Sequence, residues 1–567
     1  MITVNSAVYT IRVFDTSGEP KTTEYLLRHI QEVLEIIKRD WAVTVVAVTS
    51  DCSGESRAAR AALVKDRPEL VAPDCYAHQV ELVVRNYFSA NTRVFDCTKD
   101  ADELIKWLRG RTYLLALLRD IQTTMPGFQG QPKTVIRGVV TRWTSHYLAY
   151  RRLLELLPAL QILAQDHRLF ESGTAESHAK SREMIPIIRN GLFWHSLTRV
   201  KRHLEPLAIA TNITQSNRSR LDEVLITFGT LFHFFHSLSD PEEATVKEAV
   251  LRSLATRWGK ADQDVFIAAV ILNPFIKSKP FQRLPQVFSM AAIHALLQRL
   301  WKRFYPLHPI PPGFYDIVSS YIHETGEFSG LAITRNALSN AASDKNEPIN
   351  PVRVWTDIMI HDLDIANFPL HRLAIHILSI CPTSANCERL FSVLGWIMTK
   401  LCTRLGHTTL INLAELLLHL RDEHVRKNVK IRLRRHFGDH AKQALATSIN
   451  PNESTSSQAQ SDSSTAPNPA PSALDALLSS FAQSDMESAD EDAPDATDFP
   501  SHINMPLDSL LDFSAPFWQT RAAAASTESL EDELALWEIL DMDADGDELE
   551  GNDEGVLDDL AEVLLSA

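Results

Sequence analysis

The alternation of hydrophobic and polar residues divides the first 51 positions into a strand, a helix and a second strand. The stretch "AVYTIRVFD" (7–15) alternates apolar and polar residues like a half-buried strand. The stretch "KTTEYLLRHIQEVLEIIKRD" (21–40) repeats apolar residues at spacings of three and four positions, like an amphipathic helix. The stretch "AVTVVAVTSD" (42–51) is a β-branched run typical of a central strand. Because strands joined by a helix run parallel in one sheet, this order predicts a βαβ unit in a mainly parallel sheet.

Helical periodicity replaces the strand pattern from residue 145 to 345. The segments that carry it are "YLAYRRLLELLPALQILAQ", "DEVLITFGTLFHFFHSL", "EEATVKEAVLRSLATRW" and "AAIHALLQRLWKRFY". A second helical block follows to residue 430, and no internal repeat at a fixed period interrupts either block. We therefore expect a large all-helical region after the α/β start.

The composition changes abruptly beyond residue 448. A Ser/Thr/Pro-rich stretch is followed by short apolar clusters set among acidic residues, among them "PLDSLLDFSAPFW" and "EDELALWEILDMDADGDELE". Residues 451–567 contain 28 acidic residues and one basic residue, Arg521, so the formal charge of −16 for the whole chain leaves +11 for residues 1–450. Such a tail is typical of disordered segments that fold on a partner, including activation domains. The alternative is a solubilising tail that also shields the basic part of the chain.

Cysteine usage and the absence of long apolar runs indicate the cellular compartment of the protein. Six cysteines are thinly spread over 567 residues, which is typical of reduced thiols in cytosol or nucleus. The start "MITVNSAVYT" has no basic and apolar signal regions, and no uninterrupted apolar run reaches the ~18 residues of a membrane span. We therefore expect neither secretion nor membrane insertion.

Two short stretches near the N-terminus carry candidate chemistry. Asp51 ends the second predicted strand, and ligand sites in open α/β sheets lie at the carboxyl ends of strands. The alternative is that Asp51 caps the helix predicted after it. Cys75 and His78 form a lone C-x-x-H pair in "PDCYAHQVELVV"; no second pair of zinc ligands is nearby, so a buried cysteine and a hydrogen-bonded histidine are the simpler interpretation.

Two further stretches complete the set. Arg142 and Trp143 open a predicted helix in "VVTRWTSHYLAYRRLLEL", and a core tryptophan beside a surface arginine would explain them equally well. In "CPTSANCERLFSVLG" (381–395), Glu388 heads an otherwise apolar, helix-like run. A carboxylate there stabilises a helix start by about 0.3–1 kcal/mol through the helix dipole.

In this order, the four stretches resemble the hAT superfamily of DNA transposases from about residue 40 to 430, above all in "ERLFS" (388–392), the basic "TRL" and the Leu-rich helix after it. The resemblance implies an RNase H-like core interrupted by a helical insertion. It also implies three carboxylates that hold Mg²⁺ or Mn²⁺ for phosphoryl transfer. By motif position Asp51 corresponds to the second carboxylate and Glu388 to the third. Cys75 and His78 correspond to a core motif near the site, and Arg142 with Trp143 to a DNA-contacting pair.

The chain departs from the family pattern at its start. The family's first catalytic Asp lies on the first strand of the core, upstream of a stretch like "AVYTIRVFD", and no Asp precedes Asp15 here. A paired Cys and His zinc finger is also missing before residue 50. We therefore expect a core that lacks its first strand or strands and an incomplete catalytic site, because positioning and charge neutralisation depend on all the ligands.

The C-terminal part of the match predicts dimerisation and nucleic-acid contact. The helix "LINLAELLLHL" (410–420) is apolar on nearly every side, which suits burial against a second subunit. The predicted dimerisation residues are Phe391, Leu394, Leu410, Leu413, Leu417 and Leu420. The basic run after it predicts contacts with DNA phosphates or nuclear import through Arg426, Lys427, Arg432, Arg434 and Arg435, unless it is the solvated face of a terminal helix.

The predicted layout has four parts. They are a truncated RNase H-like part (1–144), a helical insertion (145–345), a dimerisation region that completes the core (346–440) and a disordered acidic tail (441–567). The leading hypothesis is a nuclear, transposase-derived protein that forms a homodimer or a higher homo-oligomer, binds DNA and lacks complete catalysis. The alternatives are an active metal-dependent transposase and a transcriptional regulator whose acidic tail is its effector.

Overall fold

The computed structural model describes residues 1–14, 16, 18–90, 95–126, 132–138, 143–171, 173–344, 348–358, 368–388, 390–391, 406–427 and 501–518. This part of the chain is mostly helical, and its only sheet has two strands. The prediction of a largely helical protein is therefore confirmed. An RNase H-like sheet is not among the described residues, so that part of the fold class stays a prediction.

The first strand prediction is wrong in extent. Strands β1 (Ile2–Val4) and β2 (Ala7–Tyr9) form an antiparallel hairpin, in which Ile2 faces Tyr9. The two turn residues, Asn5 and Ser6, have φ angles of 50° and 66°, the left-handed values that a two-residue hairpin turn requires. The chain therefore reverses before "AVYTIRVFD" begins, and only Ala7–Tyr9 of that stretch is a strand.

The predicted helices of the N-terminal region are present. Helix α1 (Thr23–Ile36) ends in a π-helical turn, η1 (Ile37–Trp41), and packs on α2 (Gly54–Asp66) through Leu34 and Leu63. The β-branched run at 42–51 forms only two isolated parallel bridges, Ala47 to Val71 and Ser50 to Asp74. These bridges join residues 47–50 to residues 71–74 across α2, so they are not the βαβ unit predicted for residues 7–51, whose first strand pairs with β1 instead. The parallel pairing is also too short to make a strand.

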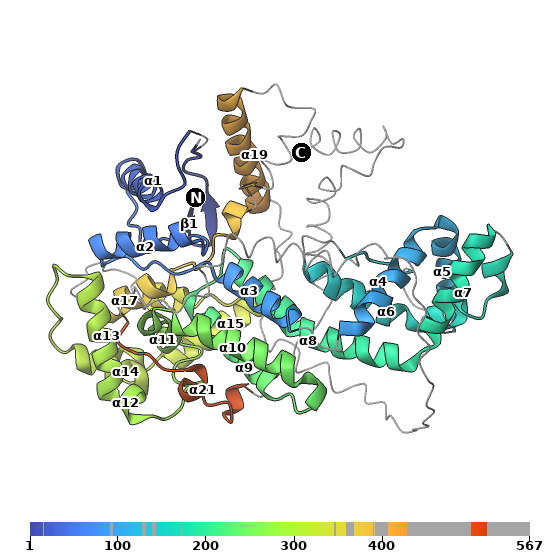
Figure 1. Ribbon diagram of the computed structural model, residues 1–567. Helices are drawn as coiled ribbons and strands as arrows, with labels where there is room; N and C mark the ends of the chain where they lie inside the picture. The colour runs from blue at the N-terminus through green and yellow to red at the C-terminus, as the bar shows by residue number, and fades with distance from the viewer. Residues whose placement is uncertain are drawn as a thin grey trace.

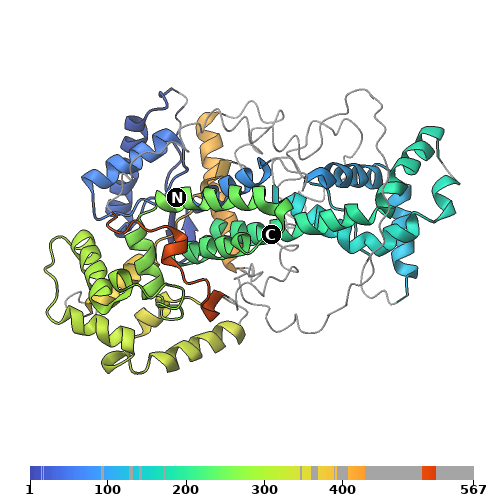
Figure 2. The ribbon, with the colours of Figure 1, turned by 60° about the horizontal axis from the view of Figure 1, so that its bottom comes forward.

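The body of the molecule is built from helices and short helical turns. These are α3 (Tyr76–Phe88), α4 (Asp96–Arg109), α5 (Thr112–Thr124), α6 (Trp143–Leu163), η3 (His167–Phe170), α7 (Ala175–Arg189), α8 (Gly191–Gln215), α9 (Leu221–His236), η4 (Pro241–Glu243), α10 (Ala244–Gly259), α11 (Gln263–Leu272), α12 (Pro285–Phe288), α13 (Met290–Phe304), α14 (Phe314–His323), η5 (Gly326–Phe328), α15 (Leu331–Asp344), α16 (Val352–Ile358) and α17 (Pro369–Leu378). Figures 1 and 2 show α4 to α7 at one end of the long helix α8 and α11 to α15 at the other.

One hydrophobic core runs through this body. It extends from Val71 to Trp518 and includes residues of α3, α8, α9, α11 and α17. Every residue of α11, "QDVFIAAVIL", is buried, and α9 is buried along nearly its whole length. Helices that are apolar on all sides need neighbours on all sides, and α9 packs on α8, α10 and α11.

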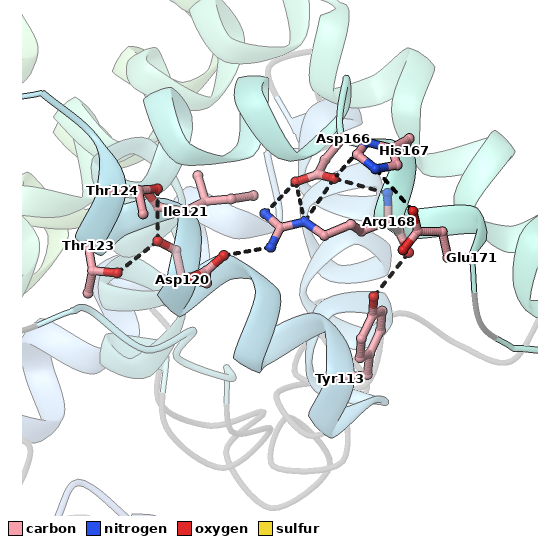
Figure 3. Close-up of polar contacts among 9 residues, drawn as sticks. All are labelled: Tyr113, Asp120, Ile121, Thr123, Thr124, Asp166, His167, Arg168 and Glu171. Carbon is pink, nitrogen blue, oxygen red and sulfur yellow. Dashed lines mark hydrogen bonds and ion pairs between the residues drawn. The ribbon is translucent and has the colours of Figure 1, made fainter.

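At the α5 end of the body, an arginine ties two helical elements together (Figure 3). Arg168 of η3 donates to Asp120 of α5 at 2.6 Å and to Asp166 at 2.7 Å. Tyr113, at the start of α5, donates to the Arg168 carbonyl oxygen at 3.1 Å. These contacts close the loop between α6 and α7 onto α5.

The C-terminal elements include one that the sequence analysis missed. Helix α19 (His407–Lys427) stands beside β2 (Figure 1), whereas residues 501–518, with α21 (Leu507–Leu510), pack on the opposite side of the body. The prediction that the whole range 441–567 is disordered is therefore wrong for 501–518, because its apolar residues are buried in the main core. Among the helices described, none is both long enough and apolar enough to cross a bilayer.

Candidate functional site

The ends of two parallel segments bring the first candidate residues to one edge. Val48 donates its amide hydrogen to the Val71 oxygen at 2.9 Å, and Cys75 donates its own to the Ser50 oxygen at 3.1 Å. Both segments stop here, so Asp51 and Asp74 lie at the same carboxyl edge. This is the position at which α/β folds place ligand sites.

The loop that opens the "CPTSANCERLFS" motif returns to this edge. Thr49 Oγ1 donates to the Cys381 oxygen at 3.3 Å, and the Tyr76 amide donates to the Pro382 oxygen at 3.0 Å. The Ser384 amide donates to Cys75 Sγ at 3.2 Å across 309 positions of sequence. The structure therefore brings together the Asp51, Cys75 and Glu388 regions that the sequence analysis grouped.

A buried arginine organises the edge. The Arg60 side chain of α2 is fully buried and donates to Asp74 Oδ1 at 2.5 Å. Its guanidinium also donates to the main-chain oxygens of Asp51 and Ala72, both at 3.3 Å. The sequence analysis missed Arg60 and Asp74. The available signal was an arginine inside the helix after Asp51 and an acid directly before Cys75.

The two predicted catalytic carboxylates are both exposed. Asp51 accepts from Ser53 Oγ at 3.3 Å, and it is Ser53, not Asp51, that caps α2. Glu388 lies in a helical turn, residues 385–388. Burial raises the pKa of the Cys387 thiol; the positive N-terminus opposes this shift, and the negative charges of Glu388 and Asp51 add to it.

These residues do not complete a two-metal site. Within the described ranges, no group of three or more His, Cys, Asp or Glu side chains is placed to hold a metal ion. Asp51, Asp74 and Glu388 are the acids of this region, but the Asp74 carboxylate already accepts from the buried Arg60, so no reaction step through a metal can be derived. Cys75 is fully buried and burial raises its pKa, which favours the neutral thiol. His78 lies one turn further along α3 and is half-buried.

The predicted DNA-contacting residues are only partly described. Trp143 is the first residue of α6 and its ring is buried in the main core, so the indole packs internally. Arg142, Arg432, Arg434 and Arg435 lie outside the described residues, and Arg426 and Lys427 are described only as the last residues of α19.

Three other cations line a small pocket beside the edge. Arg57 of α2 and Arg257 of α10, with Lys260, line it together with Cys52, Asp74 and Gln79. In the described structure, the Arg57 Nη2 atom is buried without a hydrogen-bond partner. The pocket therefore gathers three positive charges next to Asp74.

The predicted dimerisation residues fall into two groups. Leu410, Leu413 and Leu417 of α19 pack, together with Met1 and Val13, against Leu390 of the same chain. Phe391 is 66% exposed and Leu420 is 50% exposed, and Leu416, one turn before Leu420, is 53% exposed. Leu394 lies outside the described residues. The helix is therefore covered on one face by its own chain and bare on an adjacent one.

No protein-family model matches the sequence, and no curated protein matches it either.

Proposed function

We propose that this chain is a hAT-transposase-derived protein that dimerises through its C-terminal region and binds DNA, with an incomplete catalytic site. The observation that carries the proposal is the return of the 381–384 loop to the edge that bears Asp51 and Cys75. This contact joins two of the motifs that carry the resemblance across 309 positions of sequence. The resemblance in sequence supports the class of chemistry by analogy.

DNA binding is supported by charge. Residues 1–450 carry a formal charge of +11, and Arg57, Arg257 and Lys260 converge on one pocket. Cations that contact phosphates release counterions, so the logarithm of the affinity falls linearly with the logarithm of salt concentration, by about 0.9 per phosphate on duplex DNA.

The test of DNA binding is a salt titration by fluorescence anisotropy with duplex DNA. Arg57→Gln with Arg257→Gln is expected to reduce the slope by about 1 to 2. Arg252→Gln is the matched control, since Arg252 lies on the same helix, is exposed and pairs with Glu248. An unchanged slope for the double variant would exclude this pocket as a phosphate contact.

Dimerisation is supported by the bare face of α19. Leu416 and Leu420 lie one turn apart and are both about half exposed, at 53% and 50%. Leu416→Asp with Leu420→Asp is expected to halve the mass measured by light scattering, because two charges would enter the interface. Leu307→Asp, at a leucine that is 92% exposed, is the control. A dimer that survives the double variant would exclude this face. Changing Leu413 or Leu417 would also break contacts within the chain, and is therefore less informative.

The catalytic part of the proposal is tested by Mn²⁺-dependent cleavage of duplex DNA. The purified chain is expected to cleave no faster than its Glu388→Ala variant, because Asp74, the further acid at the edge, is already paired with Arg60 and leaves Asp51 and Glu388 as the predicted metal ligands. Cleavage that is lost in both Glu388→Ala and Asp51→Ala would overturn this and favour an active transposase.

A further inference from the structure

Residues 501–518, which we call the docked segment, bind the helical body far from it in sequence. The Trp258 indole N–H donates to the Met505 oxygen at 2.7 Å across 247 positions. The Ile503 amide donates to Asp264 Oδ1 at 2.9 Å, and the Met505 amide to Gln263 Oε1 at 2.8 Å. The side chains of Asp264 and Gln263, in the first turn of α11, thus accept hydrogen bonds from the backbone at the start of the segment.

The second half of the segment pairs with the loop after α11. Phe281 and Leu511 form an antiparallel bridge: the Gln282 amide donates to the Leu510 oxygen at 3.0 Å, and the Asp512 amide to the Pro280 oxygen at 2.9 Å. Short strand pairing of this kind is a common mode of peptide recognition, since backbone bonds give affinity and side-chain contacts give specificity.

Four apolar side chains anchor the segment. Leu507, Leu510, Leu511 and Trp518 are each at most 1% exposed. Phe513 stacks on Phe232 of α9, with ring centroids 5.3 Å apart. Buried aromatic and aliphatic anchors of this kind carry most of the energy of a binding interface.

Gly229 of α9 leaves room for the Trp518 ring because it has no side chain. A Cβ atom at position 229 would lie 2.3 Å from Trp518 Cη2 and 2.8 Å from Leu511 Cδ1. Glycine destabilises a helix interior, so its presence in "LITFGTLF" has a packing reason. The reason is that the Trp518 ring lies directly against the helix backbone.

We propose that the surface formed by α9, Trp258, the first turn of α11 and residues 280–282 is a peptide-binding site, with residues 501–518 as its separable ligand. The helices around it also pack directly on one another, α9 on α11 and α11 on α13. The ligand is a peptide with leucines at 507, 510 and 511 and a tryptophan at 518. While it is docked, this apolar cluster of the tail is closed to any other partner.

The test uses the full chain with a specific protease sequence substituted at residues 456–462. After cleavage, native mass spectrometry is expected to find the C-terminal fragment still bound at micromolar concentration. Excess synthetic peptide 501–518 is expected to displace it, whereas the same peptide with Trp518→Ala should bind about 100-fold more weakly, since that side chain is a buried anchor.

Two glycine variants complete the design. Gly229→Ala is expected to lose the fragment on cleavage while keeping the helical circular dichroism, because alanine favours helix but meets Trp518. Gly259→Ala is the matched control, since a Cβ there meets nothing within 4 Å. Immediate loss of the fragment from the parent chain would overturn the binding site. If excess peptide never displaces the fragment, residues 501–518 are an integral part of the fold. That result would overturn the proposal that they are a separable ligand.

Discussion

Arg60 holds the candidate edge together, and replacing it with methionine tests that role. Methionine keeps the length and apolar stem of the side chain but removes three donated bonds, to Asp74 Oδ1 and to the oxygens of Asp51 and Ala72. The Asp74 carboxylate, whose side chain is 16% exposed, then loses its cation. We expect the parallel pairing around residues 48 and 71 to open much more often.

The size of the effect follows from burial. Breaking a buried ion pair by removing one partner costs about 3–5 kcal/mol. Because Asp74 is partly exposed, we expect Arg60→Met to cost about 3 kcal/mol, at the lower end of that range. Since 1.36 kcal/mol is a factor of ten, the local opening equilibrium should rise by about 150-fold. The edge would still form, but it would spend far more time open.

Hydrogen exchange measures that opening directly. The amides of Val48, Val71 and Cys75 are all bonded across the pairing, so their exchange reports on its local stability. Peptides that contain these amides should exchange about 150-fold faster in Arg60→Met. Lys65→Met, at an exposed position of the same helix, should leave the rates unchanged.

A double-mutant cycle gives the refuting result. Arg60→Met with Asp74→Asn removes both charges, so it should cost about 2 kcal/mol less than the sum of the two single changes. A coupling near zero would show that the 2.5 Å contact does not stabilise the edge. Exchange rates in Arg60→Met close to those of Lys65→Met would refute the role of Arg60 altogether.

Three further predictions follow from other parts of the molecule. Burial lowers the pKa of His203, His371 and His376 to about 4, below the 6.5 of an exposed histidine, so the unfolded chain takes up protons first as the pH falls. Stability present above pH 6.5 should decline toward pH 4, by up to about 3 kcal/mol per histidine, and a melting temperature that stays flat over this range would contradict it. Arg168→Gln should lower the melting temperature only slightly, because its side chain is 37% exposed and exposed ion pairs contribute little; a large drop in thermal unfolding would contradict this. Deleting residues 519–567 should tighten DNA binding at low salt in anisotropy titrations if the acidic tail shields the basic part, and unchanged affinity would exclude shielding.

The helices were the most predictable part of the fold. The amphipathic repeat at 21–40 and the apolar stretch that became α9 both carry the pattern in the sequence itself. The hairpin at the start was missed because its turn uses Asn5 and Ser6 instead of a glycine, so the turn signal was weak. The β-branched run at 42–51 predicted a strand, but strand formation depends on a partner, and only short stretches of the described chain pair with it.

The sequence could predict which residues of the candidate site lie together, but not how their side chains are arranged. The resemblance put Asp51, Cys75 and Glu388 together, and the hydrogen bonds from Thr49 and Ser384 agree with that grouping. The arginine in the helix after Asp51 was too weak a signal to identify Arg60 as the residue that organises the edge, since an arginine in a helix is usually solvated. The docked segment was missed because acidic and apolar composition does not say which surface a segment binds, and here that surface belongs to the same chain.

The distance between the docked segment and its site has a consequence during synthesis. Residues 229–282 leave the ribosome more than 200 positions before Trp518 does. At about 5–20 residues per second, the apolar surface around Gly229 and Phe281 stays uncovered for roughly 10–50 s on each nascent chain. During that interval it is a target for chaperones and for neighbouring nascent chains on the same message. Slow translation of the stretch before residue 501 would therefore lower the yield of folded protein without changing its final stability.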